Sequence, residues 1–315
     1  MTNRCPLPNV LFTEGFLEPQ RAELRRRYDA GSTRRMRRRI GAEYSSPARK
    51  HESIPVPSVT LPALEAVVNF GVGYDHIDVT AARTRGITVC NTPDVLTDCV
   101  ADLAMGCIID IARGMTAADR YVRRGQWPHA PYPLGRKVSG ARVGIVGLGR
   151  IGHALAYRAE AFGMTVAYHN RRAVAGLLYR YFDDLRLLAA TSDFLVVCAS
   201  GGADSTGLVD SEVLHALGPS GFLINVARGD VVDQAALIEA LRDSVIAGAA
   251  LDVFRNEPHV PTELLDRENV LLLPHLGSAT MQSRTQMWEL LCSNVTSTLS
   301  GEAPPTPVRQ FAPAR

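Results

Sequence analysis

The amino-acid sequence predicts an α/β protein with two doubly wound parallel-sheet domains. The chain has 315 residues, and because domains usually hold about 100–200, two of them are expected. Short apolar runs alternate with amphipathic stretches, which is the order of strands and helices in a parallel sheet. Several of these runs are apolar on both faces, as strands covered by helices on both sides must be.

The larger domain is predicted from the second half of the chain, and we place it at residues 97–282. A strand, a helix and a second strand are expected, in that order, at RVGIVG, HALAYRAEAFG and MTVAYHN. Later strands of the same sheet are expected at DFLVVCA, GFLINVA, IAGAALDVF and NVLLLPH.

A smaller α/β domain is predicted upstream, with strands at NVLFTEG, LEAVVNFG and GITVCN. Residues 96–113 predict a helix that is apolar around most of its circumference, so we expect an interdomain or subunit interface to cover it. The stretch GQWPHAPYPLG predicts a surface loop, and the tail after Gly301 is expected to be loose.

The composition is that of a globular protein, with 46% hydrophobic and 21% charged residues. No stretch approaches the roughly 18 uninterrupted apolar residues of a membrane span, and the N-terminus lacks the pattern of an export signal. The six cysteines have neither the spacing of a zinc site nor the density of a disulfide framework. We therefore expect a cytoplasmic protein without a membrane partner.

The net charge of +2 conceals one strongly basic segment. Residues 21–50 hold eleven Lys and Arg against three Asp and Glu, which leaves 23 basic and 29 acidic residues elsewhere. Such a segment can contact a polyanion. The rest of the chain is mildly acidic. Despite the basic segment, we do not expect nucleic acid as a partner.

A glycine pattern, GLGRIG, lies between the predicted strand RVGIV and the helix that follows it. Gly147 and Gly149 permit a tight turn and a close approach of the backbone to a ligand, and Gly152 lets helix and strand pack. With Arg150 and Ile151 between them, these residues predict a Rossmann dinucleotide site, in which a pyrophosphate meets the start of the helix. A glycine turn without a ligand is the alternative.

The cofactor preference is predicted from the end of the second strand, where such domains usually carry an acid that binds the adenine ribose. This chain has Asn170, Arg171 and Arg172 there. An amide followed by two guanidiniums suits a 2′-phosphate, so NADP(H) is favoured and NAD(H) remains possible. The alternative is a solvated pair of arginines.

Candidate catalytic residues follow three neighbouring apolar runs, at the place where open α/β sheets bind ligands. Arg228 closes GFLINVAR, Asp252 closes IAGAALD and His275 closes NVLLLPH, while Glu257 lies in the loop FRNEP. Reduction of a keto acid needs a cation for the carboxylate and an acid that protonates the carbonyl oxygen. Arg228 and His275 supply these groups, and a neighbouring Glu257 would favour the charged imidazole. Each residue alone could equally be structural.

Together these stretches resemble the D-isomer-specific 2-hydroxyacid dehydrogenases, chiefly the glyoxylate/hydroxypyruvate reductase branch. The matching stretches are NFGVGYDHIDV, NTPDVLTD, GIVGLGRIG, NVARGDVVD, GAALDVFRNEP and PHLGSAT. The resemblance implies reduction of a small 2-keto acid to the D-2-hydroxy acid with NADPH. The resemblance implies that Arg228 binds the substrate, that Glu257 and His275 form an acid pair and that Asp252 lies beside the nicotinamide carboxamide. It also implies that the amides of Val72 and Gly73 bind the substrate carboxylate and that Ser278 lines the pocket.

The resemblance also implies a flavodoxin-like substrate domain built from residues 1–96 and 283–315, with the active site in the cleft between the domains. It further implies a homodimer whose contact includes the helix at 96–113. Trp127 would then reach toward a neighbouring subunit's site, although a plain loop aromatic is an equal alternative.

The chain departs from the family pattern at residues 30–57. The family expects a buried strand and a small-residue loop there, whereas this segment lacks a β-branched run and contains Pro55 and Pro57. Three explanations remain open: a compensated frame error in the gene, which we rank first, an unusual basic surface, or an arm that binds a polyanion.

Two other functions remain alternatives at this stage. One is a non-catalytic, nicotinamide-sensing binding protein of the same fold. The other is a different D-2-hydroxyacid dehydrogenase that uses NAD, against which the pair of arginines argues.

Overall fold

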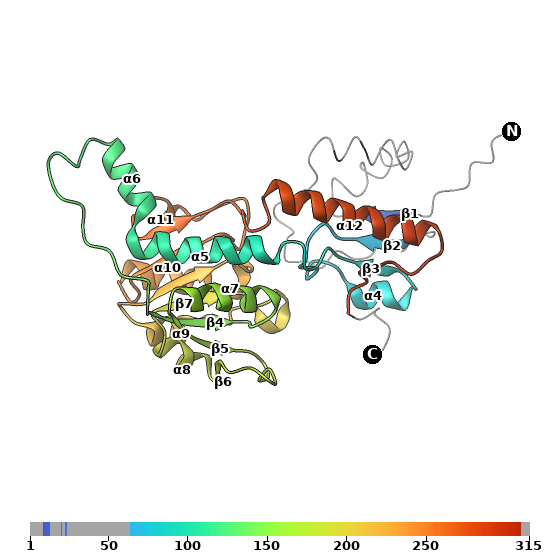
Figure 1. Ribbon diagram of the computed structural model, residues 1–315, viewed down its shortest axis with the longest axis horizontal. Coiled ribbons are helices and arrows are strands. Elements are labelled where there is room, and N and C mark those ends of the chain that lie inside the picture. Colours follow the sequence, from blue (N-terminus) through green and yellow to red (C-terminus); the bar gives the residue numbers. More distant parts are fainter. Residues whose placement is uncertain (1–8, 13–19, 21–22, 24–63, 310–315) are drawn as a thin grey trace. The chain divides into compact units, whose positions relative to one another are not determined.

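The structure is a computed structural model that describes residues 9–12, 20, 23 and 64–309. The atypical segment at 30–57 lies outside the described residues. The chain divides into two compact units, a smaller one of Met1–Leu96 with Met281–Arg315 and a larger one of Thr97–Thr280. Each unit is described below by itself (Figure 1).

The larger unit contains a seven-stranded parallel sheet in the order β10-β9-β8-β7-β4-β5-β6. Six of these strands confirm the sequence-based prediction, whereas the short edge strand β6 was not anticipated. The strand bounds are β4 Arg142–Val146, β5 Thr165–His169, β6 Arg180–Phe182, β7 Phe194–Val197, β8 Phe222–Asn225, β9 Gly248–Leu251 and β10 Val270–Leu272.

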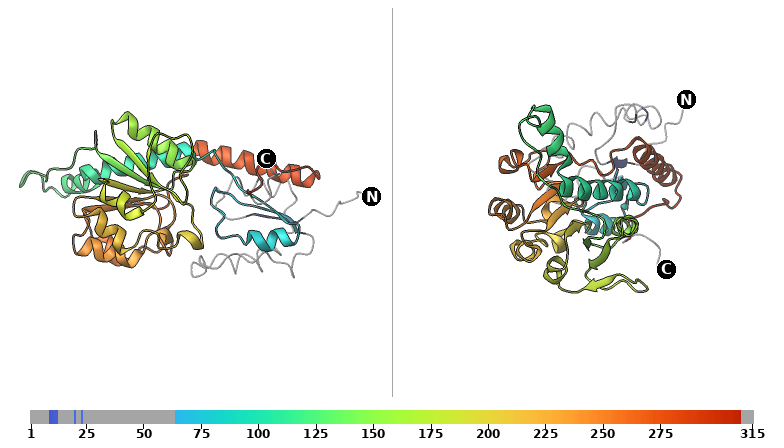
Figure 2. Two further views of the ribbon diagram at one scale, coloured as in Figure 1. Left: turned by 90° about the horizontal axis from the view of Figure 1, so that it is seen from below. Right: turned by 60° about the vertical axis from the view of Figure 1, so that its left-hand side comes forward.

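Helices cover both faces of this sheet, which is the doubly wound arrangement that was predicted (Figures 1 and 2). Helices α5 and α7 pack on each other at one face, and α8, α9 and α10 pack side by side at the other. Their bounds, with the shorter helices of this unit, are α5 Thr97–Arg113, α6 Met115–Arg123, α7 Arg150–Ala161, α8 Leu185–Ala190, η4 Ala203–Ser205, α9 Ser211–Leu217, η5 Gly229–Val231, α10 Gln234–Arg242 and α11 Thr262–Leu265.

Aspartates start the three helices of the second layer. The carboxylates of Asp184, Asp210 and Asp233 accept hydrogen bonds from backbone amides in the first turns of α8, α9 and α10. Such caps satisfy amides that have no partner within the helix, and they offset its positive end. The local sequence therefore decides where these helices begin.

Helix α5 occupies the predicted position, but its covered face has a different partner from the one expected. The buried residues of α5 include Val100, Ala104 and Ile108. The helix contacts α7 and the strands β8, β9 and β10 of its own unit. Packing within the unit therefore covers α5, and these side chains need no interface to bury them.

The smaller unit contains a described three-stranded parallel sheet in the order β1-β2-β3. All three strands agree with the prediction. Their bounds are β1 Asn9–Phe12, β2 Leu64–Val68 and β3 Thr88–Cys90, and the described helices are α4 Val79–Thr84 and α12 Met281–Leu299.

The end of the chain returns to the smaller unit. Helix α12 packs against β2, and Val308 joins a core that includes Leu64 and Val67. The expectation of a loose tail is wrong for the residues up to 309, because Thr306 donates to the carbonyl of Asn91 (2.7 Å) and accepts from the amide of Asn294 (2.7 Å). Within the described part of the chain, no helix has the length and hydropathy that crossing a membrane requires.

Asp193, just before β7, forms hydrogen bonds to Arg142 at the start of the neighbouring strand β4 and to Arg136. Its carboxylate accepts from the backbone amide of Arg142 (2.8 Å) and from the guanidiniums of Arg142 (2.8 Å) and Arg136 (2.6 Å). Hydrogen bonds from the Arg142 side chain lower the pKa of Asp193, against the opposing effect of burial, and the charge of Arg136 adds to the lowering.

We predict that Asp193→Asn destabilises the protein by about 1–3 kcal/mol at neutral pH, because two guanidiniums lose a charged acceptor. A carboxyl with a lowered folded-state pKa contributes stability above its unfolded pKa of about 3.9, and that contribution is lost as the pH falls through the lower folded value. The difference in unfolding temperature between variant and wild type should therefore be full at pH 7 and disappear in strong acid. An equal difference at all pH values would contradict this account.

Candidate active site

The turn between β4 and α7 contains two glycines of the predicted cofactor site, Gly147 and Gly149, and the third, Gly152, lies in the first turn of α7. Gly147 has φ 97°, and a Cβ there would lie 2.5 Å from the Cα of Ala199, just after β7. A Cβ on Gly152 would lie 2.5 Å from the carbonyl oxygen of Gly147. These two glycines are therefore required by close packing within the protein itself.

Gly149 has a different environment, because none of the described atoms lies within 4 Å of the place a Cβ would take. Gly149 also precedes the first turn of α7, where Arg150 and Ile151 lie, and in the described structure no side chain caps this helix. The positive end of a 12-residue helix thus borders open space. A pyrophosphate fits this arrangement of open space and helix end.

Asn170 holds the glycine turn against the end of β5. Its side-chain oxygen accepts from the amide of Leu148 (2.7 Å), and its side-chain nitrogen lies 3.5 Å from the carbonyl oxygen of the same residue. The sequence-based prediction gave Asn170 a direct bond to the 2′-phosphate, whereas the structure commits its oxygen to the turn. Sequence reasoning missed this positioning role.

The two arginines after Asn170 are exposed and differ in their contacts. Arg171 forms an ion pair with Asp204 (3.2 Å). Arg172 makes no hydrogen bond or ion pair with another described residue. Both arginines follow β5 in the chain, and β5 is the neighbour of β4, the strand that leads into the glycine turn.

The predicted catalytic residues belong to three adjacent strands. Strands β8, β9 and β10 are parallel neighbours, so their carboxyl ends lie at one edge of the sheet. Arg228 follows β8, Glu257 lies in the loop after β9, and His275 follows β10. A Cβ on Gly229 would overlap the backbone of Phe254 and Arg255, so the turn after β8 packs directly on the loop after β9.

Glu257 and His275 form a direct pair. The Nδ1 atom of His275 lies 2.9 Å from Oε2 of Glu257, and the other carboxylate oxygen accepts from the amide of Phe254 (3.1 Å). The Glu257 side chain is 18% exposed and that of His275 is 48% exposed. A carboxylate at Nδ1 orients the imidazole and leaves Nε2 as its outward nitrogen. His275 also has a positive φ of 56°, which is uncommon outside glycine.

Asp252 is buried beneath this pair. Its two carboxylate oxygens accept from the amides of Leu276 (2.6 Å) and Gly277 (2.9 Å). Burial raises the pKa of Asp252, while these two hydrogen bonds and the charge of His275 act in the opposite direction. The carboxylate therefore holds the loop that carries His275 and the half-buried Ser278, whereas its predicted contact with the nicotinamide carboxamide stays a prediction.

Asn225, the last residue of β8, is a further positioning residue that sequence reasoning missed. Its side-chain nitrogen donates to the carbonyl of Arg228 (2.9 Å), and its side-chain oxygen accepts from the amide of Ala227 (3.1 Å). Asn225 is 1% exposed. The sequence did contain a signal for this role, because Asn225 ends an otherwise apolar strand. A polar side chain buried at such a position requires hydrogen-bond partners.

In the smaller unit, two buried amides organise the turn after β2. Asn69 donates to the carbonyls of Gly71 (2.9 Å) and Gly73 (3.0 Å), and Asn91 donates to that of Val72 (2.8 Å). In a trans peptide the carbonyl and the following N–H point in opposite directions. The amides of Val72 and Gly73 therefore point away from these asparagines, and neither has an acceptor among the described residues.

The described residues contain no group of three His, Cys, Asp or Glu side chains that could hold a metal ion.

The chain is similar to known dehydrogenases in sequence and in structure. The sequence profile of the D-isomer specific 2-hydroxyacid dehydrogenase, NAD binding domain, matches residues 105–277. Glyoxylate/hydroxypyruvate reductase A of Arabidopsis thaliana is 48% identical over 248 residues, which are 79% of this chain and 79% of that protein. The chain belongs to the D-isomer-specific 2-hydroxyacid dehydrogenase family.

Other members of the family are similar over much of the chain. The 2-ketogluconate reductase of Gluconobacter oxydans is 44% identical over 79% of this chain and 80% of its own length. The crystal structure of the NADPH-dependent glyoxylate/hydroxypyruvate reductase of Sinorhizobium meliloti, in complex with NADP and malonate, has a TM-score of 0.83 and 39% sequence identity, and the match covers 98% of this chain and 99% of that chain. The α/β fold with its NAD-binding domain is therefore that of a dehydrogenase.

We predict that Gly149→Ala folds normally but weakens dinucleotide binding at least about tenfold, because its methyl group enters space that a pyrophosphate would fill. Titration of the protein with NADPH, followed by the fluorescence of the cofactor, measures this. Gly106→Ala, at another position where a Cβ meets no described atom within 4 Å, is the matched control and should bind as wild type does. Equal binding by both variants would remove the cofactor from this turn.

Proposed function

We propose that this protein reduces a small 2-keto acid, such as glyoxylate or hydroxypyruvate, to the D-2-hydroxy acid, with NADPH as the preferred reductant. The observation that supports this most directly is the pair of Glu257 and His275 at 2.9 Å, on the sheet edge that also carries Arg228. The Arabidopsis and Sinorhizobium relatives are named for this activity. Use of NADH remains possible.

The glycine turn at 147–152 would hold a reduced nicotinamide dinucleotide, which would supply the hydride that the carbonyl carbon receives. The guanidinium of Arg228 binds the substrate carboxylate and polarises the carbonyl, which stabilises the charge that develops on its oxygen. His275 donates the proton from Nε2 to that oxygen, so hydride and proton together convert the ketone to the alcohol. Ser278, on the loop after His275, lines the substrate pocket.

Glu257 orients the imidazole through Nδ1, so that Nε2 is the nitrogen that donates the proton. Because the second oxygen of Glu257 is held by the amide of Phe254, the carboxylate has one orientation in which to receive the imidazole. The same pair then accepts the proton in the reverse direction, as a general base.

The amides of Val72 and Gly73 are proposed to bind the substrate carboxylate as well. Backbone N–H groups held in a turn bind an anion without reorganising, because the side chains of Asn69 and Asn91 already fix their peptide planes.

The preference for NADPH rests on Arg171 and Arg172, together with the amide of Asn170 at the position where an acid would repel a 2′-phosphate. The Sinorhizobium relative, whose structure contains NADP, is described as NADPH-dependent. Asp252 contributes to the cofactor site by holding the loop at 276–277.

We predict that His275→Gln lowers kcat for glyoxylate and hydroxypyruvate by about 10²–10⁴-fold, because the proton donor is lost. Binding of NADPH should persist, since the glycine turn is unchanged. The measurement is the oxidation of NADPH at 340 nm, set beside a fluorescence titration of the cofactor.

His215→Gln, in which an exposed histidine of α9 is changed, is the matched control and should retain full turnover. Unchanged turnover in His275→Gln would exclude this histidine as the acid. Absence of any keto-acid reduction by correctly folded wild-type protein would instead favour a binding protein that senses nicotinamide cofactors.

We also propose a homodimer formed through the arm, which we define as residues 115–139 and which contains α6 and the predicted surface loop. Large apolar side chains are exposed along it: Met115, Val122, Trp127 and Leu134. Exposed apolar side chains grouped on one segment are typical of an interface. The reach of Trp127 into a neighbouring site is part of this proposal.

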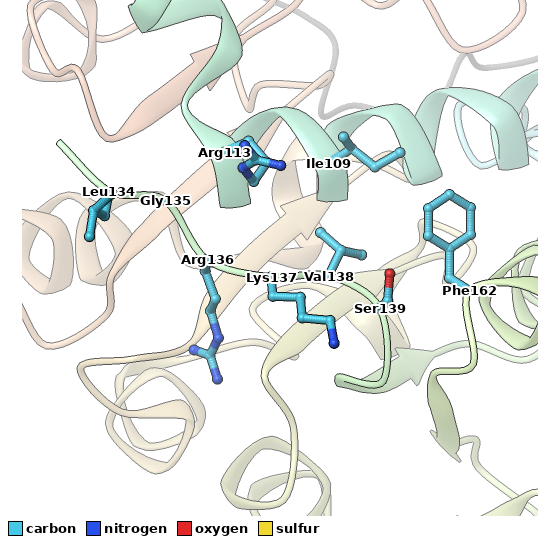
Figure 3. Close-up of a pocket in the computed structure, with 9 residues that line it drawn as sticks. All are labelled: Ile109, Arg113, Leu134, Gly135, Arg136, Lys137, Val138, Ser139 and Phe162. Carbon is cyan, nitrogen blue, oxygen red and sulfur yellow. The ribbon is translucent and has the colours of Figure 1, made fainter. Parts of the chain in front are cut away.

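A cavity of about 390 Å³ lies where the arm meets α5. Figure 3 shows the segment 134–139 beside the helix that carries Ile109 and Arg113. Because this segment leads into the start of β4, the cavity lies at the amino ends of the strands, away from the candidate catalytic edge. We therefore assign it to the proposed dimer contact.

We predict that Leu134→Asp converts the dimer to a monomer, because it places a charge where an apolar side chain would be buried. Sedimentation velocity reports the change. Leu178→Asp, at an equally exposed leucine between β5 and β6, is the control and should remain dimeric. A wild-type protein that sediments as a monomer at micromolar concentration would overturn the proposal.

A reducing, cytoplasmic location is proposed because the six cysteines are scattered along the chain, without the density of a disulfide framework.

A further inference from the structure

One acidic side chain lies at the candidate cofactor site although the sequence has no acid at the end of β5. Asp204 belongs to η4, in the loop after β7, and its carboxylate forms an ion pair with Arg171 (3.2 Å). The side chains are highly exposed, at 86% for Arg171 and 83% for Asp204. A ligand can therefore reach this pair without any rearrangement of the core.

The pair lies at the dinucleotide turn. Arg171 directly follows Asn170, whose side chain is bonded to Leu148 in that turn. The loop that carries Asp204 begins beside the same turn, because Gly147 packs against Ala199. The ends of β4, β5 and β7 thus bring Arg171 and Asp204 together from positions 33 residues apart.

We propose that Asp204 sets the cofactor preference of this protein, by competing with the 2′-phosphate of NADPH for the guanidinium of Arg171. This inference rests on the proposed binding of NADP(H) at the same site. A phosphate group that binds Arg171 must either displace the carboxylate or share the guanidinium with it, and in the second case it lies near a like charge. NADH has a hydroxyl at this position, so it binds without displacing Asp204.

Arg172 makes the competition partial. Its guanidinium has no ion pair or hydrogen bond within the described chain, so it is available to a phosphate while Arg171 is engaged. Asp204 therefore reduces the advantage of NADPH over NADH and does not abolish it. A sequence reading of the strand end alone, which sees an amide and two arginines, overestimates the selectivity for NADPH.

The test is the dissociation constant of the full-length protein for NADPH and for NADH, measured by cofactor fluorescence without any keto acid. Asp204→Asn should tighten NADPH binding about three- to fivefold, in line with the strength of an exposed ion pair, and leave NADH binding unchanged. The gain should shrink as the ionic strength rises.

Asp243→Asn is the matched control, because Asp243 forms an exposed ion pair with Arg242 just before β9, at the opposite end of the strands. It removes the same charge and should change neither constant. In an Arg171→Gln background, Asp204→Asn should no longer tighten NADPH binding, because the contested guanidinium is absent.

Unchanged or weaker NADPH binding by Asp204→Asn would overturn the proposal, since the carboxylate would then be neutral or would help to position Arg171. A gain that persists in Arg171→Gln would overturn the competition for the guanidinium. Because the titration uses no substrate, these outcomes are independent of whether a keto acid is reduced.

Discussion

The candidate active site depends on one buried residue, Asp252, that joins the ends of three strands. Its backbone amide donates to the carbonyl of Asn225 at the end of β8, and its carbonyl accepts from the amide of His275 after β10. Its carboxylate binds the next two amides of the loop, those of Leu276 and Gly277. A buried carboxylate is tolerated only when its oxygens are hydrogen-bonded, so the loop and the charge stabilise each other. The position of His275 follows from this constraint.

Side-chain amides hold the other loops of the candidate site by hydrogen bonds to the backbone. Asn225 holds the turn before Arg228, Asn170 holds the glycine turn, and Asn69 holds the turn that contains Val72 and Gly73. A side-chain amide has both a hydrogen-bond donor and an acceptor. It can therefore bind either a backbone carbonyl or a backbone N–H that has no backbone partner in the turn. The result is a set of backbone and charged groups that are oriented before any ligand binds, which is the arrangement that electrostatic catalysis requires.

The strands were predictable because a strand buried on both faces must be apolar on both, and runs such as FLVV and GAAL show this directly. The three-residue edge strand Arg180–Phe182 was not predicted, because its sequence, RYF, contains no apolar run. The other edge strand, Val270–Leu272, was predicted because it lies within such a run. The partners of the buried face of α5 within its own unit were not predicted, since the hydropathy of a helix says that it is covered but not by what. The roles of Asn170 and Asn225 were missed because the sequence does not show which backbone groups a side-chain amide will bind.

The sequence by itself determined the order of strands and helices, the glycine turn and the residue types at the strand ends. These features follow from local periodicity and from contacts between near neighbours in the chain. The pair of Glu257 and His275 was predicted, and the tertiary structure gave its geometry. Only the tertiary structure decided that Asp252 binds the loop at 276–277 and that Asp204 meets Arg171. The contact of Asp204 with Arg171 joins segments that follow β7 and β5, and it depends on a strand order, β10-β9-β8-β7-β4-β5-β6, that differs from the order along the chain.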